Sequence, residues 1–217
     1  MRGLDAIGYF HICTDGRKLP WMFQDDDDFI AGINRIGLCY LKTGVIIIAY
    51  VLMDNHVHFV LYGTMLQCKQ FINTYKRLTG IWILNKYGIG DYLRLLPTEI
   101  IRIENEESLL NTIAYLDRNP LMAGYKYMHG EYPWGSSRYA FKDISTLTLS
   151  KGGFKPISTL SRRRQRELLN SKVLFPDEWL INDSGMIHPL SFLNINKLED
   201  CYKSPMRYSY FLAKKLE

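Results

Sequence analysis

The chain has 217 residues, and its 27 basic against 22 acidic residues give a formal net charge of +5 at pH 7. Hydrophobic residues make up 47% and charged residues 23%, which are ordinary values for a folded chain and exclude global disorder. The longest apolar run, residues 45–53, has about half of the ~20 residues that a membrane-spanning helix needs, so we expect no contact with a membrane. The mild basicity permits nucleic-acid binding without demonstrating it.

The first ten residues include Asp5 and lack a long apolar stretch, so we expect no signal peptide. The cysteines form no CxxC pair, which favours neither a zinc ribbon nor a disulfide framework; they are Cys13, Cys39, Cys68 and Cys201. A reducing compartment is typical of such cysteines, and the expected location is cytoplasmic.

The predicted elements begin with a strand over residues 7–13, in which apolar positions alternate, followed by a turn at Asp15-Gly16. Four acidic residues, 25–28, then precede apolar residues at helical spacing. Acidic side chains in the first turn suit the amino terminus of a helix, which we expect to end at Gly44.

Residues 45–52 are almost wholly apolar and rich in β-branched side chains, as in a central strand that is buried on both faces. A tight turn at Asp54-Asn55 leads into a second strand over residues 56–62, predicted to be antiparallel to the first. A long helix is predicted over residues 66–87, and the glycines that follow it, Gly88 and Gly90, end it.

Residues 98–103 alternate as a strand, and residues 104–119 are predicted to form a helix that stops before Pro120. The order β-α-β-β-α-β, followed by a helix, matches a ferredoxin-like split βαβ antiparallel sheet. The predicted fold class is therefore α+β, with the helices on one face of the sheet.

The composition changes near residue 140, which divides the chain into a domain over residues 1–140 and a C-terminal extension over residues 141–217. Residues 145–161 are rich in Ser, Thr and Gly and are predicted to be a linker. Residues 162–166, four of which are arginines, open a short helix.

The clearest local feature is His56-Val57-His58, predicted to lie inside a strand. Side chains at i and i+2 share one face ~7 Å apart, so the two imidazoles can share a metal ion while Val57 and Phe59 face the core. Two ordinary surface or hydrogen-bonded histidines are the alternative. His11, on the first strand, either faces the same site or is a satisfied histidine of the sheet.

Tyr115 and Asn119 are one helical turn apart and share a polar sector of the predicted helix with Ser108, Asn111 and Thr112. The opposite side is apolar apart from Asp117, which is the exception to the pattern. A tyrosine in a polar sector points away from the expected core. It is either functional or an exposed surface tyrosine.

Basic residues alternate with aromatic residues along the chain, and phosphate attraction combined with stacking is what single-stranded nucleic acid requires. A solvated surface is the alternative interpretation. The candidates for nucleic-acid binding are Lys69, Lys76, Arg77, Arg118 and Arg138.

Three segments together resemble the HUH single-tyrosine transposases, and especially the REP-associated tyrosine transposases. Residues 49–58, AYVLMDNHVH, resemble that family's AYVLMPNHVH segment. Residues 115–124, YLDRNPLMAG, are similar to its YI..NPV.AG helix end, and residues 132–137, YPWGSS, to its Y.WSS segment. The likeness spans residues 7–139. It departs from the family at Asp54, where proline is usual, and at residues 90–98, which lack a WQ.RF-type stretch.

The resemblance implies a metal-dependent enzyme that cleaves and rejoins single-stranded, hairpin-forming DNA through a 5′-phosphotyrosine intermediate. It implies Tyr115 as the catalytic nucleophile and His56, His58 and Asn119 as ligands of a divalent ion, Mg²⁺ or Mn²⁺. A neutral phenol is a weak nucleophile, so such a site needs positive charge nearby. Whether Tyr115 serves the histidines of its own chain or those of a second copy in a homodimer stays open.

Two alternatives belong to other classes. The chain could be a non-catalytic nucleic-acid-binding regulator derived from a transposase. It could also be a metal enzyme that cleaves another phosphodiester with water instead of tyrosine.

Overall fold

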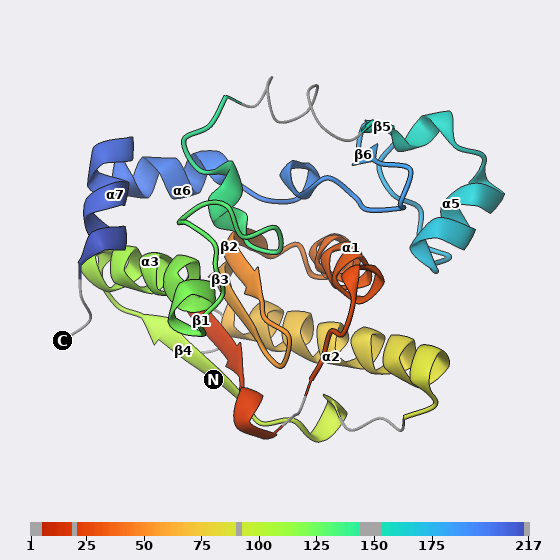
Figure 1. Cartoon of the computed structure of the whole chain (residues 1–217), viewed down its shortest axis with the longest axis horizontal. Helices are drawn as coiled ribbons and strands as arrows, with labels where there is room; N and C mark the ends of the chain where they lie inside the picture. Colours follow the sequence, from red (N-terminus) through yellow and green to blue (C-terminus); the bar gives the residue numbers. More distant parts are fainter. Residues whose placement is uncertain (1–5, 19–20, 90–92, 144–152, 215–217) are drawn as a thin grey trace.

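The computed structural model describes residues 6–18, 21–89, 93–143 and 153–214. Figure 1 shows an antiparallel sheet at the centre, with strand order β2-β3-β1-β4. Its strands are β1 (Gly8–Thr14), β2 (Ile46–Leu52), β3 (Val57–Gly63) and β4 (Thr98–Ile103). This order places β3 between β2 and β1, and β1 between β3 and β4, which is the split βαβ arrangement. The predicted α+β, ferredoxin-like class is confirmed.

Helices cover both faces of this sheet. On one face α1 (Asp26–Thr43) packs beside α2 (Met65–Tyr87), where Phe71 of α2 contacts Phe59 with ring centroids 5.1 Å apart. On the other face α3 (Glu106–Met122) places Tyr115 against His58. The expectation of helices on one face therefore holds for α1 and α2 only. The helix after β4 has an apolar side of its own to bury, and the second face of the sheet accepts it.

Local capping explains where α1 and α2 begin and end. The Asp25 carboxylate accepts a hydrogen bond from the Asp28 backbone N–H at 3.0 Å, and Gly44 closes α1 with a φ of 64°. A capping box between Thr64 and Gln67 opens α2, and Gly88 ends it with a φ of 69°. A positive φ is strained for residues with a Cβ, so the predicted stops at Gly44 and Gly88 are confirmed with a physical cause, while Gly90 lies outside the described residues.

Helix α3 does not stop before Pro120, as predicted, but continues to Met122. Pro120 lies in the last turn, so its missing N–H costs one hydrogen bond, that to the Leu116 carbonyl. The Ala123 N–H still donates to the Asn119 carbonyl at 3.0 Å, which closes the turn.

Residues 153–214 pack onto the sheet and its helices. The Asn34 side chain of α1 donates to the Gly185 carbonyl and accepts from the Ile187 N–H, both at 2.8 Å. Helices α6 (Ile195–Tyr202) and α7 (Pro205–Ala213) lie beside α3 (Figure 1). These residues belong to the same hydrophobic core as the sheet. The boundary at residue 140 stays a prediction.

Residues 145–152 of the predicted linker lie outside the described residues. Its remainder contains β5 (Lys155–Pro156), which pairs with β6 (Leu180–Ile181). Between these two strands lies α5 (Arg162–Leu169), the expected short basic helix. Among the described residues, no helix has the length and hydropathy that crossing a bilayer requires.

Candidate active site

Strand pairing collects the polar side chains of the site. Cys13 of β1 is paired with His58 of β3 on one side and with Glu99 of β4 on the other. Directly paired residues project to the same face of a sheet, so these three form a row across three strands. His11, two residues before Cys13, lies on the same face. The ring of Tyr115, on α3, lies against the ring of His11, so this is the face of the sheet that α3 covers.

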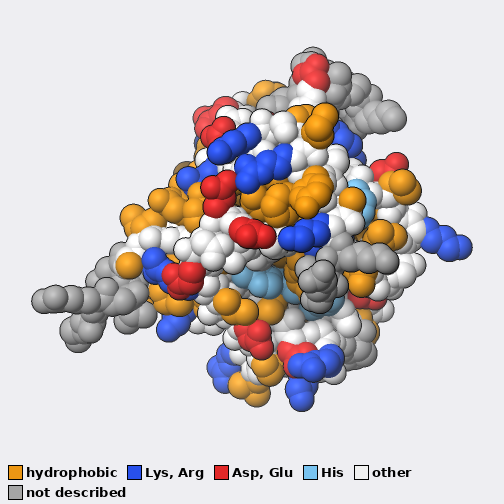
Figure 2. Space-filling view, turned by 90° about the vertical axis from the view of Figure 1, so that its left-hand side faces the viewer, with side chains coloured by type: hydrophobic (Ala, Val, Ile, Leu, Met, Phe, Trp, Pro, Cys, Tyr) orange, Lys and Arg blue, Asp and Glu red, His pale blue; other side chains and the backbone are white. Residues whose placement is uncertain are grey.

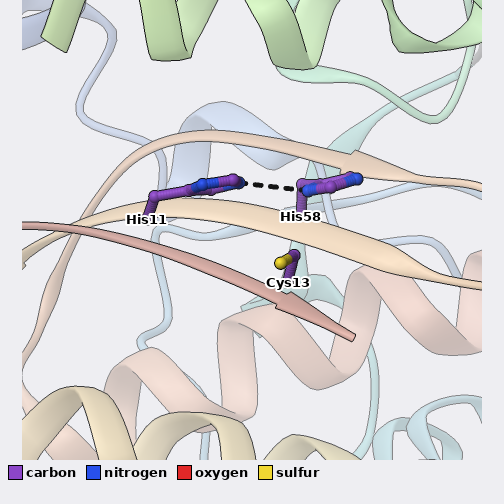
Figure 3. A group of neighbouring side chains, drawn as sticks. All are labelled: His11, Cys13 and His58. Atoms are coloured by element: carbon purple, nitrogen blue, oxygen red, sulfur yellow. Dashed lines mark hydrogen bonds between the residues drawn. The ribbon is translucent and has the colours of Figure 1, made fainter. Parts of the chain in front are cut away.

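His11 and His58 are in direct contact. Nε2 of His11 lies 3.1 Å from Nδ1 of His58, so one nitrogen donates to the other. Figure 3 shows this bond, with Cys13 close to the ring of His58. The metal-binding atoms of His11, Cys13 and His58 all lie within 4.8 Å of one another. His11 therefore faces the predicted site, the first of its two possible interpretations, and Cys13 joins it without any signal in the sequence.

His56 lies in the turn before β3, not inside the strand as predicted. The turn is closed by a hydrogen bond from the Met53 N–H to the His56 carbonyl at 2.8 Å, so the strand begins at Val57. Nδ1 of His56 is 2.6 Å from Oδ1 of Asn55. The rings of His56 and His58 are still close, with centroids 4.9 Å apart, and Val57 is buried as predicted.

Helix α3 brings Tyr115 and Asn119 to the two histidines. Nδ2 of Asn119 lies 3.3 Å from Nε2 of His58. The ring centroid of Tyr115 is 5.5 Å from that of His58 and 6.2 Å from that of His11, edge-on in both contacts. The structure therefore brings together the four residues predicted to form the catalytic and metal site.

A pocket of about 430 Å³ opens at this point, lined by Tyr115, His56 and His58 together with Cys13, Glu99 and Arg17. On the side of the molecule that Figure 2 presents, histidine side chains reach the surface. Arg17 and Glu99 were not predicted as lining residues, although Arg17 directly follows the predicted Asp15-Gly16 turn.

Burial keeps the imidazoles neutral. It lowers the pKa of His58 to about 2, helped by the neighbouring His56 and His11, and it lowers the pKa of His11 to about 4. The pKa of His56 is also lowered by burial, against a hydrogen bond with Asn119 and the charge of Asp54. Neutral imidazoles have a free lone pair at neutral pH, as metal binding requires.

The donor chemistry of His56, His58 and Asn119 fits a divalent cation. Rotation of the Asn119 amide about its side-chain bond exchanges the positions of its oxygen and nitrogen, so an oxygen can face the imidazoles. Imidazole nitrogens suit Mn²⁺ and Zn²⁺, whereas Mg²⁺ prefers oxygen ligands.

The five predicted nucleic-acid-binding residues do not gather at this pocket. Lys76 is 7% exposed, and its ammonium donates to the Leu96 carbonyl at 2.5 Å. Arg118, also buried, donates to the Phe211 carbonyl at 3.2 Å. Both cationic side chains therefore donate hydrogen bonds to backbone carbonyls inside the protein.

The other three basic residues are more accessible. Lys69 and Arg77 are exposed on α2, which covers the face of the sheet opposite to His58. Arg138 is half-buried, with its guanidinium 5.7 Å from the ring centroid of Tyr139. The basic residue that does line the pocket is Arg17, whose side chain is 90% exposed and paired with Asp15.

The fold and site define an α+β protein whose split βαβ sheet carries a histidine-rich polar cluster beneath a helix. No protein-family model and no curated protein matches the chain. It is similar to a solved structure of the REP-associated tyrosine transposase bound to a REP hairpin, with 11% sequence identity and a TM-score of 0.44 over 61% of this chain and 78% of that one. Identity and superposition this low transfer neither a residue role nor an activity.

Proposed function

We propose that this chain is a metal-dependent enzyme that cleaves and rejoins single-stranded DNA, with Tyr115 as its nucleophile. The supporting observation is the convergence of a strand, a turn and a helix on His58: Tyr115 and His56 line one pocket with it, and Asn119 contacts its ring from behind that pocket's lining. A covalent nucleophile next to a set of cation ligands is what phosphodiester transfer by tyrosine requires.

His56, His58 and Asn119 would hold the divalent ion, Mg²⁺ or Mn²⁺. When bound there, the ion supplies Lewis-acid polarisation of the phosphate oxygens. The neutral state of both imidazoles near pH 7 supports this assignment, because protonated histidines cannot serve as ligands.

The Tyr115 oxygen attacks a backbone phosphorus of the DNA. A bond forms between this oxygen and phosphorus while the bond from phosphorus to the 3′ oxygen breaks. The phenolic proton leaves to solvent, and the departing 3′ oxygen takes up a proton. The products are a 5′-phosphotyrosine and a free 3′-hydroxyl. Attack by a 3′-hydroxyl reverses the step and releases Tyr115, so rejoining needs no nucleoside triphosphate.

The substrate and assembly belong to the proposal as well. The pocket is open to solvent and flanked by Arg17, which favours a flexible phosphate backbone over a rigid duplex. Because the Tyr115 and His58 rings of one chain are already in contact, the site is proposed to work within a single chain. A hairpin in the substrate and a homodimer stay predictions.

The substitution Tyr115→Phe is expected to abolish the covalent protein–DNA adduct while DNA affinity changes by less than about twofold, because the aromatic ring remains. A hairpin-bearing single-stranded oligonucleotide with Mn²⁺, analysed on a denaturing gel, measures the adduct. Tyr125→Phe and Tyr127→Phe are the matched controls and should form adduct normally. Persistent adduct in Tyr115→Phe would refute the assignment.

Replacing both His56 and His58 with alanine is expected to reduce DNA cleavage roughly 100-fold or more, since both proposed cation ligands are lost. The exposed His129→Ala is the control and should cleave as the wild type does. Undiminished cleavage by the double variant would exclude the metal role. Two other outcomes would identify the alternatives: DNA binding without cleavage or adduct indicates a regulator, and cleavage without adduct indicates attack by water.

A further inference from the structure

One row of side chains at the site contains three residues, His11, Cys13 and Glu99, that have no part in the proposed reaction. His58, Cys13 and Glu99 are paired across β3, β1 and β4, and His11 adjoins Cys13 on the same face. We propose that His11, Cys13 and His58, with Glu99 as the fourth ligand, form a second cation site that takes a thiophilic divalent ion such as Zn²⁺.

The spacing of the donor atoms supports a tetrahedral ion. At zinc bond lengths a tetrahedral ion holds its ligand atoms about 3.3–3.8 Å apart. The nitrogens of His11 and His58 are already 3.1 Å apart, and the sulfur of Cys13 lies within 4.8 Å of both. Small side-chain rotations close the remaining difference. Because the backbone of all these strands is fixed by the sheet, the ligands are largely pre-arranged.

Glu99 lies outside the group whose donor atoms are within 4.8 Å of one another, and its carboxylate would reach the ion by rotating in from the solvent side. Its Oε2 lies 4.0 Å from the sulfur of Cys13, and the residue is exposed. Cys13, His58 and Glu99 all line the 430 Å³ pocket, which gives an ion access from solvent. A closed four-ligand site with two nitrogens, one sulfur and one carboxylate oxygen matches zinc chemistry.

The thiol distinguishes this site from the His56–His58–Asn119 set. Thiolate ligands select Zn²⁺ and other soft ions, whereas Mg²⁺ binds oxygen. On binding, the ion takes the thiolate of Cys13, and the thiol proton is released to solvent.

His58 belongs to both sets. Its Nδ1 faces His11, and its Nε2 faces Asn119. A neutral imidazole has one lone pair, so it can serve a single ion at a time. Zn²⁺ bound through Nδ1 is therefore expected to exclude the catalytic ion and to inhibit cleavage, an expectation that rests on the proposed function.

The binding test uses Co²⁺ as a spectroscopic probe on the reduced, metal-free full-length chain. Thiolate ligation of Co²⁺ produces a near-ultraviolet charge-transfer band, which Zn²⁺ should bleach. Cys13→Ala is expected to remove this band and to weaken Zn²⁺ binding at least tenfold. Cys201→Ala is the matched control, since Cys201 is another half-buried cysteine, and it should keep the band. The absence of the band in the wild type, or its survival in Cys13→Ala, would overturn the proposal.

Glu99→Gln provides a variant at an exposed position that leaves the core intact. It is expected to weaken Zn²⁺ binding about tenfold, and unchanged affinity would overturn the four-ligand site. His56→Ala is expected to keep the cobalt band, because His56 is not a ligand here; loss of the band would show that a single set exists.

The spectroscopic readout separates this proposal from the proposed function. A cobalt band in a wild-type chain that forms no DNA adduct would refute the function and leave the cation site standing. Adduct formation that saturating Zn²⁺ does not inhibit would overturn the sharing of His58.

Discussion

His58 faces a different partner from each of its ring nitrogens. Nδ1 contacts His11, and Nε2 contacts Asn119. When Nε2 offers its lone pair to an ion, the proton is on Nδ1 and donates to His11. His11 thereby fixes the tautomer and the ring orientation, as the outer partners of metal-binding histidines usually do.

The buried histidines make stability depend on pH. In the folded chain the pKa of His11 is about 4, against 6.5 for a free imidazole, because burial disfavours the charged form. Between these values the unfolded chain binds more protons, so stability is lost as pH falls from 6.5 towards 4. Going from pH 7 to pH 5 should cost on the order of 2 kcal/mol through His11, and His58 acts in the same direction.

The measurement is urea unfolding of the metal-free chain at pH 7 and pH 5. His11→Gln should reduce the pH-dependent loss of unfolding free energy, since glutamine does not titrate. An equal loss in His11→Gln and wild type would show that the His11 imidazole is not the group responsible.

At the scale of elements, the carboxyl end of α3 holds the C-terminal helix α7. Arg118 donates to the Phe211 carbonyl at 3.2 Å and also to the Lys214 carbonyl at the end of that helix. Its neighbour Asp117 accepts a hydrogen bond from the Tyr208 hydroxyl. The polar exception that the sequence placed among apolar positions is thus a buried link between two helices.

Burial raises the pKa of Asp117 to about 7 from its ordinary 3.8. Between pH 3.8 and pH 7 the folded chain binds more protons than the unfolded chain. The unfolding free energy of the protein therefore falls as pH rises over this interval. Asp117→Asn keeps an acceptor for Tyr208 but removes the charge. It should raise the unfolding free energy by about 1–3 kcal/mol more at pH 8 than at pH 5. Thermal or urea unfolding measures this, and equal effects at both pH values would contradict it.

Local signals made most elements predictable. Gly44 and Gly88 stop helices because of their own backbone freedom, and the acids at residues 25–28 cap α1 from adjacent positions. The predictions went wrong where tertiary context decides. Pro120 is accommodated because a last-turn proline costs a single hydrogen bond, and His56 lies in a turn because the Met53 N–H closes it.

Part of the site was predictable because the residues of each pair lie close together in the sequence. Tyr115 and Asn119 share one turn of a helix, and His56 and His58 are two residues apart, so spacing along the chain reveals each pair. The row of Cys13, His58 and Glu99 depends on the register of three strands that are far apart in sequence. Spacing alone cannot supply that register. Spacing along the chain also could not reveal that the Lys76 ammonium is buried against the Leu96 carbonyl.

At the scale of the whole molecule, the C-terminal residues complete the core. Leu198 and Tyr202 of α6 are fully buried, and the Tyr202 hydroxyl donates to the Leu110 carbonyl of α3 at 2.5 Å. Asn194 donates its backbone N–H to the Ile47 carbonyl of β2 at 2.9 Å. The helix that carries Tyr115 is thus held from one side by the sheet and from the other by α6 and α7.

A chain cut after residue 143 is therefore expected to lose most of its stability, because the apolar surfaces of β2 and α3 become exposed to water. Urea unfolding and the binding of a hydrophobic dye are measured on the cut chain and on the full chain. The cut chain should bind more dye and unfold at lower urea. Unfolding at the same urea concentration would instead support an independent domain over residues 1–140.

The central claim is that Tyr115 becomes joined to DNA, and peptide mapping of the covalent adduct tests it most directly. Trypsin cuts after Arg102 and Arg118, and residues 103–118 contain Tyr115 as their single tyrosine, while Tyr125 and Tyr127 fall in the next two peptides. Mass spectrometry of the digested adduct should find the 5′-phosphate on the peptide 103–118. A phosphate on the peptide 119–126 or 127–138 would contradict the account. So would the absence of any covalent adduct when the wild-type chain is incubated with DNA and Mn²⁺.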